Sequence, residues 1–352
     1  MKHAIIVGFG LAGFHYALEL QKHKKDFIII SNEEEGSSRS AAGVFNPTVL
    51  KRYTMSWKGK EFFDQAIITY SLFEKAYNTS IFNKIPIKYY FNCLSDHNNW
   101  AVASQKKGLN HFLLQSIINE VDGGLKGDFG YGKLKNVGKL DVNKLLDMFK
   151  NKLASDCFSQ STFNYKELKF LDNKIEYKGI KAKYIIFCEG FKLRYNPWFS
   201  YLPLIGSKGE FLYIRTKEIS QKEIIKRGLF IVPMGKDLFW VGANFDRKYK
   251  TLRPTKLGKE WILSKLKDVI DCSFEVVNHK AAIRPTVQDR RPLLGAHPIE
   301  KNIYVYNGMG TRGVLMGPLL AKWMYNFVVG GKKLCPEIAI DRFETYFSNP
   351  RK

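Results

Sequence analysis

The first thirty residues alternate apolar and glycine-rich segments in the order strand, loop, helix, strand. An apolar run at 4–7 leads into Gly8, Gly10 and Gly13, a helix-forming segment follows at 14–23, and a second apolar run covers 26–31. Short continuous apolar runs on both sides of an amphipathic segment are typical of buried parallel strands joined by a helix. The spacing G-x-G-x-x-G therefore predicts a βαβ unit that binds a dinucleotide.

Each glycine of this loop has a steric reason to be there. Gly8 permits the tight turn after the strand, Gly10 lets the backbone approach a pyrophosphate, and Gly13 allows the helix to pack against the strand. The helix N-terminus offers unpaired N–H groups and a positive dipole end to the phosphates, so Leu11 and Ala12 are expected cofactor-binding residues as well. A purely structural glycine turn is the alternative.

The second strand lacks the acidic residue that usually follows it and binds the adenosine ribose. Ser31 and Asn32 stand at that place, and Glu33 comes next. Ser31 or Asn32 could hydrogen-bond the ribose, or a shifted register could bring in Glu33. The sequence leaves these alternatives open.

Two further segments resemble ligand-binding loops. Residues 36–49 (GSSRSAAGVFNPTV) are mostly small, and such a loop can align backbone N–H groups on a phosphate or a flavin edge. Residues 302–331 again predict a strand at 303–306, a loop containing Gly308, Gly310 and Gly313, and a helix. Pro318 is expected in the first turn of that helix, because an interior proline would break it.

The order of the motifs along the chain resembles one family. GFGLAG at 8–13, SRSAAG at 38–43, YIIFCEGF at 184–191, IRPTVQDRRPLLG at 283–295, YNGMGTRGVLMGP at 306–318 and IDRF at 340–343 are similar to motifs of the D-amino acid oxidase and glycine oxidase (DAO) family of FAD-dependent oxidoreductases. Within this family, GTRGVLMGP and AAGVFNP look most like the FAD domain of the bacterial bifunctional enzymes that complete 5-methylaminomethyl-2-thiouridine in tRNA. The resemblance covers the oxidase half of those enzymes.

The resemblance implies noncovalent FAD. It assigns the pyrophosphate to the first loop, the ribityl chain and flavin to the second, the middle of the cofactor to the residues after the strand at 184–187, and the flavin N1/C2=O edge to the C-terminal loop and its helix N-terminus. The expected cofactor-binding residues of these later segments are Ser38, Arg39, Ser40, Ala41, Ala42, Gly43, Cys188, Glu189, Gly190, Gly308, Met309, Gly310, Thr311, Arg312, Gly313 and Val314. The segment 281–295 contains no cysteine to which a flavin could be attached.

Two arginines are the expected catalytic residues. Arg284 matches the family arginine that binds a substrate carboxylate, and bidentate pairing makes such a residue selective for amino-acid-like substrates. A surface or interdomain ion pair is the alternative, and Arg312 would be a second anion contact. Two positions depart from glycine oxidases: Phe230 stands where they carry a substrate-side tyrosine, and Thr311 where they carry an arginine.

The implied fold class is α/β (α+β, two domains), with a Rossmann-like FAD-binding domain interleaved with an antiparallel-sheet substrate domain. The FAD-binding domain is expected at 1–55, 131–215 and 283–352, and the substrate domain at 56–130 and 216–282. The residues support the second domain independently. Residues 62–77 form an amphipathic helix pattern, and 209–216, 229–233 and 237–245 form strand patterns with a turn at 235–237.

Composition narrows the class of protein. A chain of 352 residues, 45% hydrophobic and 25% charged, is ordinary for a globular enzyme. No apolar run reaches the roughly 18–20 residues of a membrane span, so we expect a cytoplasmic enzyme. The five cysteines are scattered and the seven histidines lack a metal-binding spacing, so neither a disulfide framework nor a metal site is expected.

The formal net charge of +23 has two interpretations. It is typical of a protein with a polyanionic partner such as RNA, and it is also typical of a lysine-rich proteome, since the lysines are spread along the chain. Charge alone does not decide between them.

Three functions follow from these observations. The first is an FAD-dependent oxidase or dehydrogenase that oxidises the C–N bond of an amino-acid-like amine by hydride transfer to flavin N5, with oxygen or another electron acceptor. The second is a tRNA wobble-uridine modifying FAD oxidase that removes a carboxymethyl group, with tRNA as partner. The third is a non-catalytic flavin-binding protein.

Overall fold

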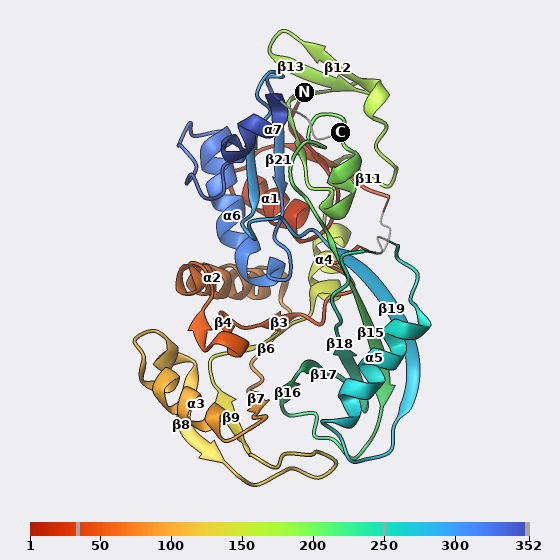
Figure 1. Ribbon diagram of the computed structural model, residues 1–352. Helices are drawn as coiled ribbons and strands as arrows, with labels where there is room; N and C mark the ends of the chain where they lie inside the picture. Colours follow the sequence, from red (N-terminus) through yellow and green to blue (C-terminus); the bar gives the residue numbers. More distant parts are fainter. Residues whose placement is uncertain (33–35, 249–250, 349–352) are drawn as a thin grey trace. The chain divides into compact units, whose positions relative to one another are not determined.

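The computed structural model describes residues 1–32, 36–248 and 251–348, and the chain divides into two units (Figure 1). Unit 1 consists of Met1–Arg39, Val142–Ser207 and Ile283–Lys352, and unit 2 of Ser40–Asp141 and Lys208–Ala282. Each unit is therefore assembled from segments that are distant in the sequence. The boundaries expected from the sequence lie at residues 55, 130, 215 and 282.

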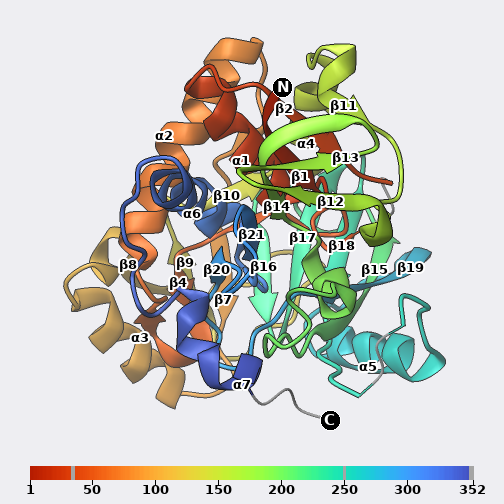
Figure 2. The same ribbon diagram turned by 90° about the horizontal axis from the view of Figure 1, so that it is seen from above.

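The centre of the unit 1 sheet is parallel. Four strands lie side by side in the order β2 (Phe27–Ile30), β1 (Lys2–Val7), β14 (Ile180–Phe187) and β21 (Ile303–Asn307), all running in one direction (Figure 2). All of β2 and the last four residues of β1 are buried, as expected for strands covered on both faces. The predicted βαβ unit is confirmed, with α1 (Leu11–Lys22) as its helix.

The other strands of this sheet extend its edges. β11 (Phe158–Ser159) pairs with β2 in parallel, while β13 (Lys174–Tyr177) pairs antiparallel with both β14 and β12 (Leu168–Leu171). β20 (Leu293–Ala296) pairs antiparallel with β21. Counted over the described residues, the sheet has eight strands. At their carboxyl ends, the parallel strands β1, β14 and β21 lead into glycine-containing loops.

Helices α4 (Val142–Asn151) and α6 (Gly313–Val328) pack against α1, and the short α7 (Glu344–Ser348) follows near the C-terminus. The approach of α1 and α6 depends on a glycine. A Cβ atom on Gly317 would lie 2.3 Å from Cδ2 of His15, so only glycine fits there without a shift. Further along the two helices, the rings of His23 and Tyr325 stack 4.2 Å apart.

The prediction for Pro318 is wrong. It is the sixth residue of α6, beyond the first turn, and the helix continues through it. A proline there cannot donate a hydrogen bond to the carbonyl of Val314, which normally weakens a helix. Packing compensates for this loss, because Leu315, Leu320 and Met324 are almost fully buried on either side of the proline.

The large sheet of unit 2 has eight strands among the described residues, in the order β19-β15-β18-β17-β16-β7-β9-β8. Their bounds are β19 Glu275–Arg284, β15 Ser207–Arg215, β18 Leu238–Gly242, β17 Leu229–Gly235, β16 Ile224–Arg227, β7 Ile87–Tyr90, β9 Tyr131–Leu134 and β8 Leu113–Ile118. The expected antiparallel arrangement does not hold between β16 and β7, which run parallel. These two strands come from distant segments, so no hairpin fixes their direction.

The two faces of this sheet are covered by different parts of the chain. Leu229 and Ile231 of β17 point to the face that packs on α5 (Lys256–Lys267, Figure 1), whereas Val232 and Phe230 point to the opposite face. This opposite face belongs to an apolar cluster that includes Ala42, and we call it the Phe230 face.

The other α-helices and strands in the described part of unit 2 lie outside this large sheet. They are α2 (Gly59–Tyr77) and α3 (Ser95–Gln105), the antiparallel sheet of β3 (Val44–Phe45), β10 (Gly138–Leu140) and β6 (Phe82–Asn83), and the pair β4 (Thr48–Val49) and β5 (Thr54–Met55). Within the described part of the chain, no helix combines the length and apolarity needed to cross a membrane.

Candidate functional site

The first glycine loop joins β1 to α1 by a turn that only small residues allow. Gly8 has φ +98° and its N–H donates to the carbonyl of Ile30 at 2.9 Å. A Cβ atom on Gly8 would lie 2.6 Å from the carbonyl oxygen of Cys188, and one on Gly13 would lie 2.0 Å from the carbonyl oxygen of Gly8. Both positions therefore require glycine for close backbone packing.

The start of α1 is suited to an anion. Gly10 is its N-cap, and in the described structure no side chain caps the helix through Gly10 and no acidic residue occupies the first turn. The N–H of Leu11 donates to Oγ of Ser38 at 3.0 Å, so the structure brings the second loop next to the first. Backbone N–H groups at a helix N-terminus, with a hydroxyl beside them, are a suitable environment for a pyrophosphate.

The end of β2 is engaged with a neighbouring segment. The backbone of Ser31 exchanges hydrogen bonds with the chain after β11, donating to the carbonyl of Ser159 and accepting from Ser161 N–H, both at 3.1 Å. Asn32 Nδ2 donates to Oγ1 of Thr162 at 3.4 Å. Glu33 lies outside the described residues. A contact of any of these residues with the ribose stays a prediction.

The expected flavin loop at 38–43 is anchored at several points. In unit 1, Arg39 Nη1 lies 2.8 Å from Oδ1 of Asp147 on α4. In unit 2, Nε1 of Trp240 donates to the carbonyl of Ser40 at 3.3 Å. Gly43 accepts from Leu140 N–H at 2.8 Å, and a Cβ on Gly43 would lie 1.9 Å from the Leu140 carbonyl oxygen.

In the same loop, Ala42 is buried in the cluster of the Phe230 face, and the neighbouring Ala41 is exposed. Backbone contacts thus position most of this loop, while the Arg39 side chain forms an ion pair.

The C-terminal glycine loop lies against the other two loops of unit 1. Nδ2 of Asn307 donates to the carbonyl of Gly190 at 2.9 Å, and its Oδ1 accepts from Gly308 N–H at 2.8 Å. A Cβ on Gly313 would lie 3.0 Å from Cδ1 of Leu11, so the starts of α6 and α1 are close neighbours. The side chain of Asn307 thus links the loops that follow β14 and β21.

Sequence reasoning missed Asn307. The available signal was a polar residue at the end of an apolar strand, directly before a glycine. Asn307 is only 2% exposed, and both ends of its amide are used. A buried amide that bonds two loops fixes their spacing.

Open space next to two of these loops is consistent with a bound cofactor. Gly190 has φ +57°, and a Cβ there would meet no described atom within 4 Å; a Cβ on Gly310, at φ +56°, would meet only Thr286 Oγ1 at 4.0 Å. Glycine lets a ligand approach such backbone closely. The glycine loops, the starts of α1 and α6 and this open space beside the backbone fit FAD.

Glu189 follows β14 and is held by two donors. Oη of Tyr165 donates to one carboxylate oxygen at 2.5 Å, and Nδ2 of Asn196 to the other at 2.8 Å. Burial raises the pKa of this carboxyl to about 7, although both hydrogen bonds and the charge of Lys192 act in the opposite direction. The carboxylate is therefore bound within unit 1, and its contact with a cofactor stays a prediction.

Burial lowers the pKa of both candidate catalytic arginines. Arg284 ends β19, and burial lowers its pKa to about 10, which leaves the guanidinium charged at neutral pH. Burial also lowers the pKa of Arg312, the N-cap of α6. The segment after Arg284 is tied to the C-terminal loop, since Gly310 N–H donates to the carbonyl of Pro285 at 3.2 Å. By contrast, Arg291 lies 3.7 Å from Glu337 in a partly exposed ion pair.

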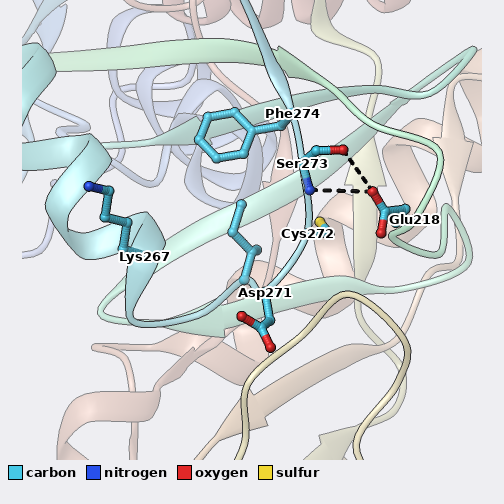
Figure 3. A pocket seen from close by; sticks show the side chains of 7 residues that line it. Glu218, Lys267, Asp271, Cys272, Ser273 and Phe274 are labelled. Atoms are coloured by element: carbon cyan, nitrogen blue, oxygen red, sulfur yellow. Dashed lines mark hydrogen bonds between the residues drawn. The ribbon is translucent and has the colours of Figure 1, made fainter.

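A separate pocket of about 610 Å³ lies in unit 2 (Figure 3). Its lining residues are Glu218, Lys267, Ile270, Asp271, Cys272, Ser273 and Phe274. None of the predicted site residues is among them. Glu218 already accepts hydrogen bonds from the Ser273 hydroxyl at 2.9 Å and from its N–H at 3.3 Å, so its carboxylate serves the local fold.

One known protein family matches most of this chain. The family model for FAD dependent oxidoreductases (DAO) matches residues 3–326. A curated relative, the tRNA 5-methylaminomethyl-2-thiouridine biosynthesis bifunctional protein MnmC of Legionella pneumophila (strain Philadelphia 1), is 24% identical over 377 residues, covering 92% of this chain and 54% of that protein. The chain thus spans about half the length of this relative.

Solved structures share the fold at low sequence identity. Glycine oxidase from Geobacillus kaustophilus superposes with a TM-score of 0.78 at 17% identity, over 97% of each chain. Glycine oxidase from Bacillus cereus has a TM-score of 0.80 at 14% identity, over 95% of this chain and 96% of that one. Because the family model covers most of the chain, the protein belongs to the DAO family of FAD-dependent oxidoreductases.

Proposed function

We propose that this protein oxidises the C–N bond of an amine that carries a carboxylate group. Arg284 is the observation that carries the proposal: a charged, partly buried guanidinium whose following residue accepts a hydrogen bond from the C-terminal glycine loop. A guanidinium pairs with a carboxylate through two parallel hydrogen bonds, which fixes the orientation of an amino-acid-like substrate. Arg312, at the start of α6, supplies a second cation.

The chemistry assigned to the chain's own residues is binding and orientation. Bound FAD would supply the acceptor for the hydride that leaves the carbon next to the amine. The start of α6 and the N–H groups of its glycine loop supply the positive potential that favours reduction. Arg284 holds the substrate so that the reacting carbon is correctly placed, and such placement is a large part of catalysis in reactions of this kind.

The test uses FAD-reconstituted protein and N-substituted glycines under anaerobic conditions. We expect bleaching of the visible flavin bands by the wild type. Arg284→Ala should keep its FAD but need about 10- to 100-fold more substrate for half-maximal bleaching, since it loses a charge-assisted pair. Arg194→Ala, which changes an exposed arginine, is the matched control. Equal substrate dependence of the Arg284 and Arg194 variants would refute the carboxylate assignment.

A second candidate places the amine on tRNA. It is supported by the net charge of +23 and by the similarity to MnmC, a relative named for tRNA 5-methylaminomethyl-2-thiouridine biosynthesis. In that case the carboxymethyl group of a wobble uridine would supply both the carboxylate and the oxidised carbon. Bleaching by undermodified tRNA, without bleaching by free amines, would favour this candidate. FAD binding without bleaching by either would favour a non-catalytic flavoprotein.

A further inference from the structure

Met309 is the one methionine in the four loops that are expected to bind FAD, at 8–13, 38–43, 188–190 and 308–314. It is half-buried and stands between Gly308, at φ +79°, and Gly310, at φ +56°. Met316 and Met324, a few residues further along the chain, are buried on α6. Part of Met309 is therefore accessible to small solutes, whereas the two methionines of the helix are not.

The sulfur atom of Met309 lies near a hydroxyl group. Oη of Tyr306 is 3.8 Å from Sδ of Met309, and the same hydroxyl donates to the carbonyl of Gly317 on α6 at 2.7 Å. Tyr306 is fully buried, and the centroid of its ring lies 6.5 Å from that of Tyr16 on α1. The hydroxyl beside the thioether is thus held between α1 and α6.

The methyl end of Met309 lies at the contact between the starts of these two helices. A Cβ atom on Gly313, the first residue of α6, would lie 3.8 Å from Cε of Met309 and 3.0 Å from Cδ1 of Leu11, the first residue of α1. A tightly packed contact of this kind does not accept an extra atom without a shift. An atom added to the Met309 sulfur therefore acts on both helix starts that fit the cofactor.

Hydrogen peroxide converts a thioether into a sulfoxide. One peroxide oxygen bonds to sulfur, the O–O bond breaks, and the second oxygen leaves as water with both hydrogen atoms. Sulfur loses two electrons and peroxide gains them, so no further reactant is needed. The new oxygen is a stronger hydrogen-bond acceptor than the thioether sulfur, and it would compete with the Gly317 carbonyl for the Tyr306 hydroxyl.

We propose that Met309 is a site of oxidation by hydrogen peroxide and that its sulfoxide weakens the binding of FAD. The inference rests on the proposed function, in which oxygen as electron acceptor would take two electrons and two protons from the reduced cofactor and leave as peroxide. An oxidase with this residue limits its own turnover when peroxide accumulates. A methionine sulfoxide reductase would restore the thioether and the affinity for FAD.

The test adds hydrogen peroxide to FAD-reconstituted protein, removes it with catalase, and measures the dissociation constant of FAD by flavin fluorescence. Met309→Leu keeps the size of the side chain and removes the sulfur. Met148→Leu, at a half-buried methionine of α4 in the same unit, is the matched control. We expect peroxide to weaken FAD binding about 10-fold in the wild type and in Met148→Leu, and to leave Met309→Leu unchanged.

Peptide mass spectrometry of the same samples locates the added oxygen atom. Met309 should be oxidised before the buried Met316 and Met324, and a methionine sulfoxide reductase should restore FAD binding. Both measurements use the wild type, so they hold even if Met309→Leu does not fold. Oxidation of Met309 no faster than that of Met316 would overturn the inference, and so would unchanged FAD affinity after Met309 is oxidised. An equal loss of affinity in Met309→Leu and wild type would overturn it as well.

The outcome is separable from the proposed function, because the peroxide is added and no amine is oxidised. A protein that loses FAD through oxidation of Met309 but is not bleached by any amine would refute the proposed function and leave the oxidation site intact. Bleaching by an amine, together with FAD binding that peroxide does not change, would refute the role of Met309 alone.

Discussion

At the scale of single residues, the carboxyl group of Glu189 changes its protonation state at an unusually high pH. Its carboxyl pKa is raised to about 7 by burial, well above the ordinary value of 4.5. Between these two values, the folded protein binds more protons at this position than the unfolded chain does. The contribution of Glu189 to stability therefore falls as the pH rises through this window, and it is fully present only below about pH 4.5.

Replacing Glu189 by Gln should remove this pH dependence. Relative to wild type, Glu189→Gln is expected to gain up to about 3 kcal/mol of unfolding free energy on going from pH 4.5 to pH 8. The absolute stability of the variant also changes, because the amide cannot accept hydrogen bonds from both Tyr165 and Asn196, but that loss is the same at each pH. Urea denaturation at several pH values measures the difference.

The control for Glu189 is Glu61→Gln, which changes an exposed glutamate of α2. Its unfolding free energy should follow the wild-type pH dependence. If Glu189→Gln also followed it, the raised pKa would be wrong.

Residue-scale features differ in how far the sequence could predict them. The turn at Gly8 and the helix contact at Gly13 were predictable, because both arise within one βαβ unit, whereas the close approach of Gly8 to the Cys188 carbonyl was not. The environment of Glu189 was not, since it depends on Tyr165 and Asn196, which reach it through the fold and not through any pattern in the sequence. Asn307 was missed for the same reason: its partner Gly190 is 117 residues away.

At the scale of elements, one buried carboxylate holds helix α5 to the sheet of unit 2. Glu210 of β15 is 2% exposed and accepts from both the N–H and the hydroxyl of Thr255, the N-cap of α5, at 2.8 and 2.9 Å. It also lies 3.0 Å from Lys208 Nζ. These contacts lower the pKa of Glu210 despite its burial, so the carboxylate is ionised and its interactions depend on the charge.

Glu210→Ala should therefore be strongly destabilising. It leaves the buried Lys208 ammonium without its carboxylate and the start of α5 without its acceptor, a loss of about 3–5 kcal/mol of unfolding free energy. Glu260→Ala, on the exposed side of α5 and 3.9 Å from Lys256, should cost less than about 1 kcal/mol. Guanidinium denaturation compares the two; similar costs would contradict the assigned role.

The two glycine loops of unit 1 should respond differently to alanine. Gly13→Ala would place Cβ 2.0 Å from the Gly8 carbonyl oxygen, so α1 must shift and the melting temperature should drop sharply. Gly310→Ala meets no such atom and should cost only about 1–2 kcal/mol through its φ of +56°. It should still weaken FAD binding, measured by flavin fluorescence, because Cβ enters the open space. Unchanged FAD affinity in the Gly310 variant would argue against that loop as part of the cofactor site.

Elements were predicted well where the pattern is local. The strands at 4–7 and 303–306 and the helix after the first loop follow from short apolar runs and glycines. The position of Pro318 was wrong because a local rule against interior proline is overruled by packing of Leu315 and Leu320 around it. The parallel pairing of β16 with β7 depends on long-range assembly, which hydrophobic alternation does not specify.

At the scale of the whole molecule, the excess of positive charge bears on the choice of substrate. Binding of tRNA through phosphate contacts would release counterions, and its affinity would then fall steeply with salt. If tRNA is the substrate, six to ten such contacts would lower the affinity by about 10³- to 10⁵-fold between 50 and 200 mM salt. Filter binding with unmodified and undermodified tRNA measures this slope. An affinity that does not change with salt would exclude tRNA binding through phosphate contacts.

Whether the chain is an amine-oxidising flavoenzyme is decided by anaerobic mixing of FAD-reconstituted protein with an N-substituted glycine or with undermodified tRNA, followed by visible absorption. We expect flavin bands in the reconstituted protein and their loss on addition of one of these amines. Flavin bands that persist with every carboxylated amine, in a protein that is folded and loaded with FAD, would contradict the proposed oxidation.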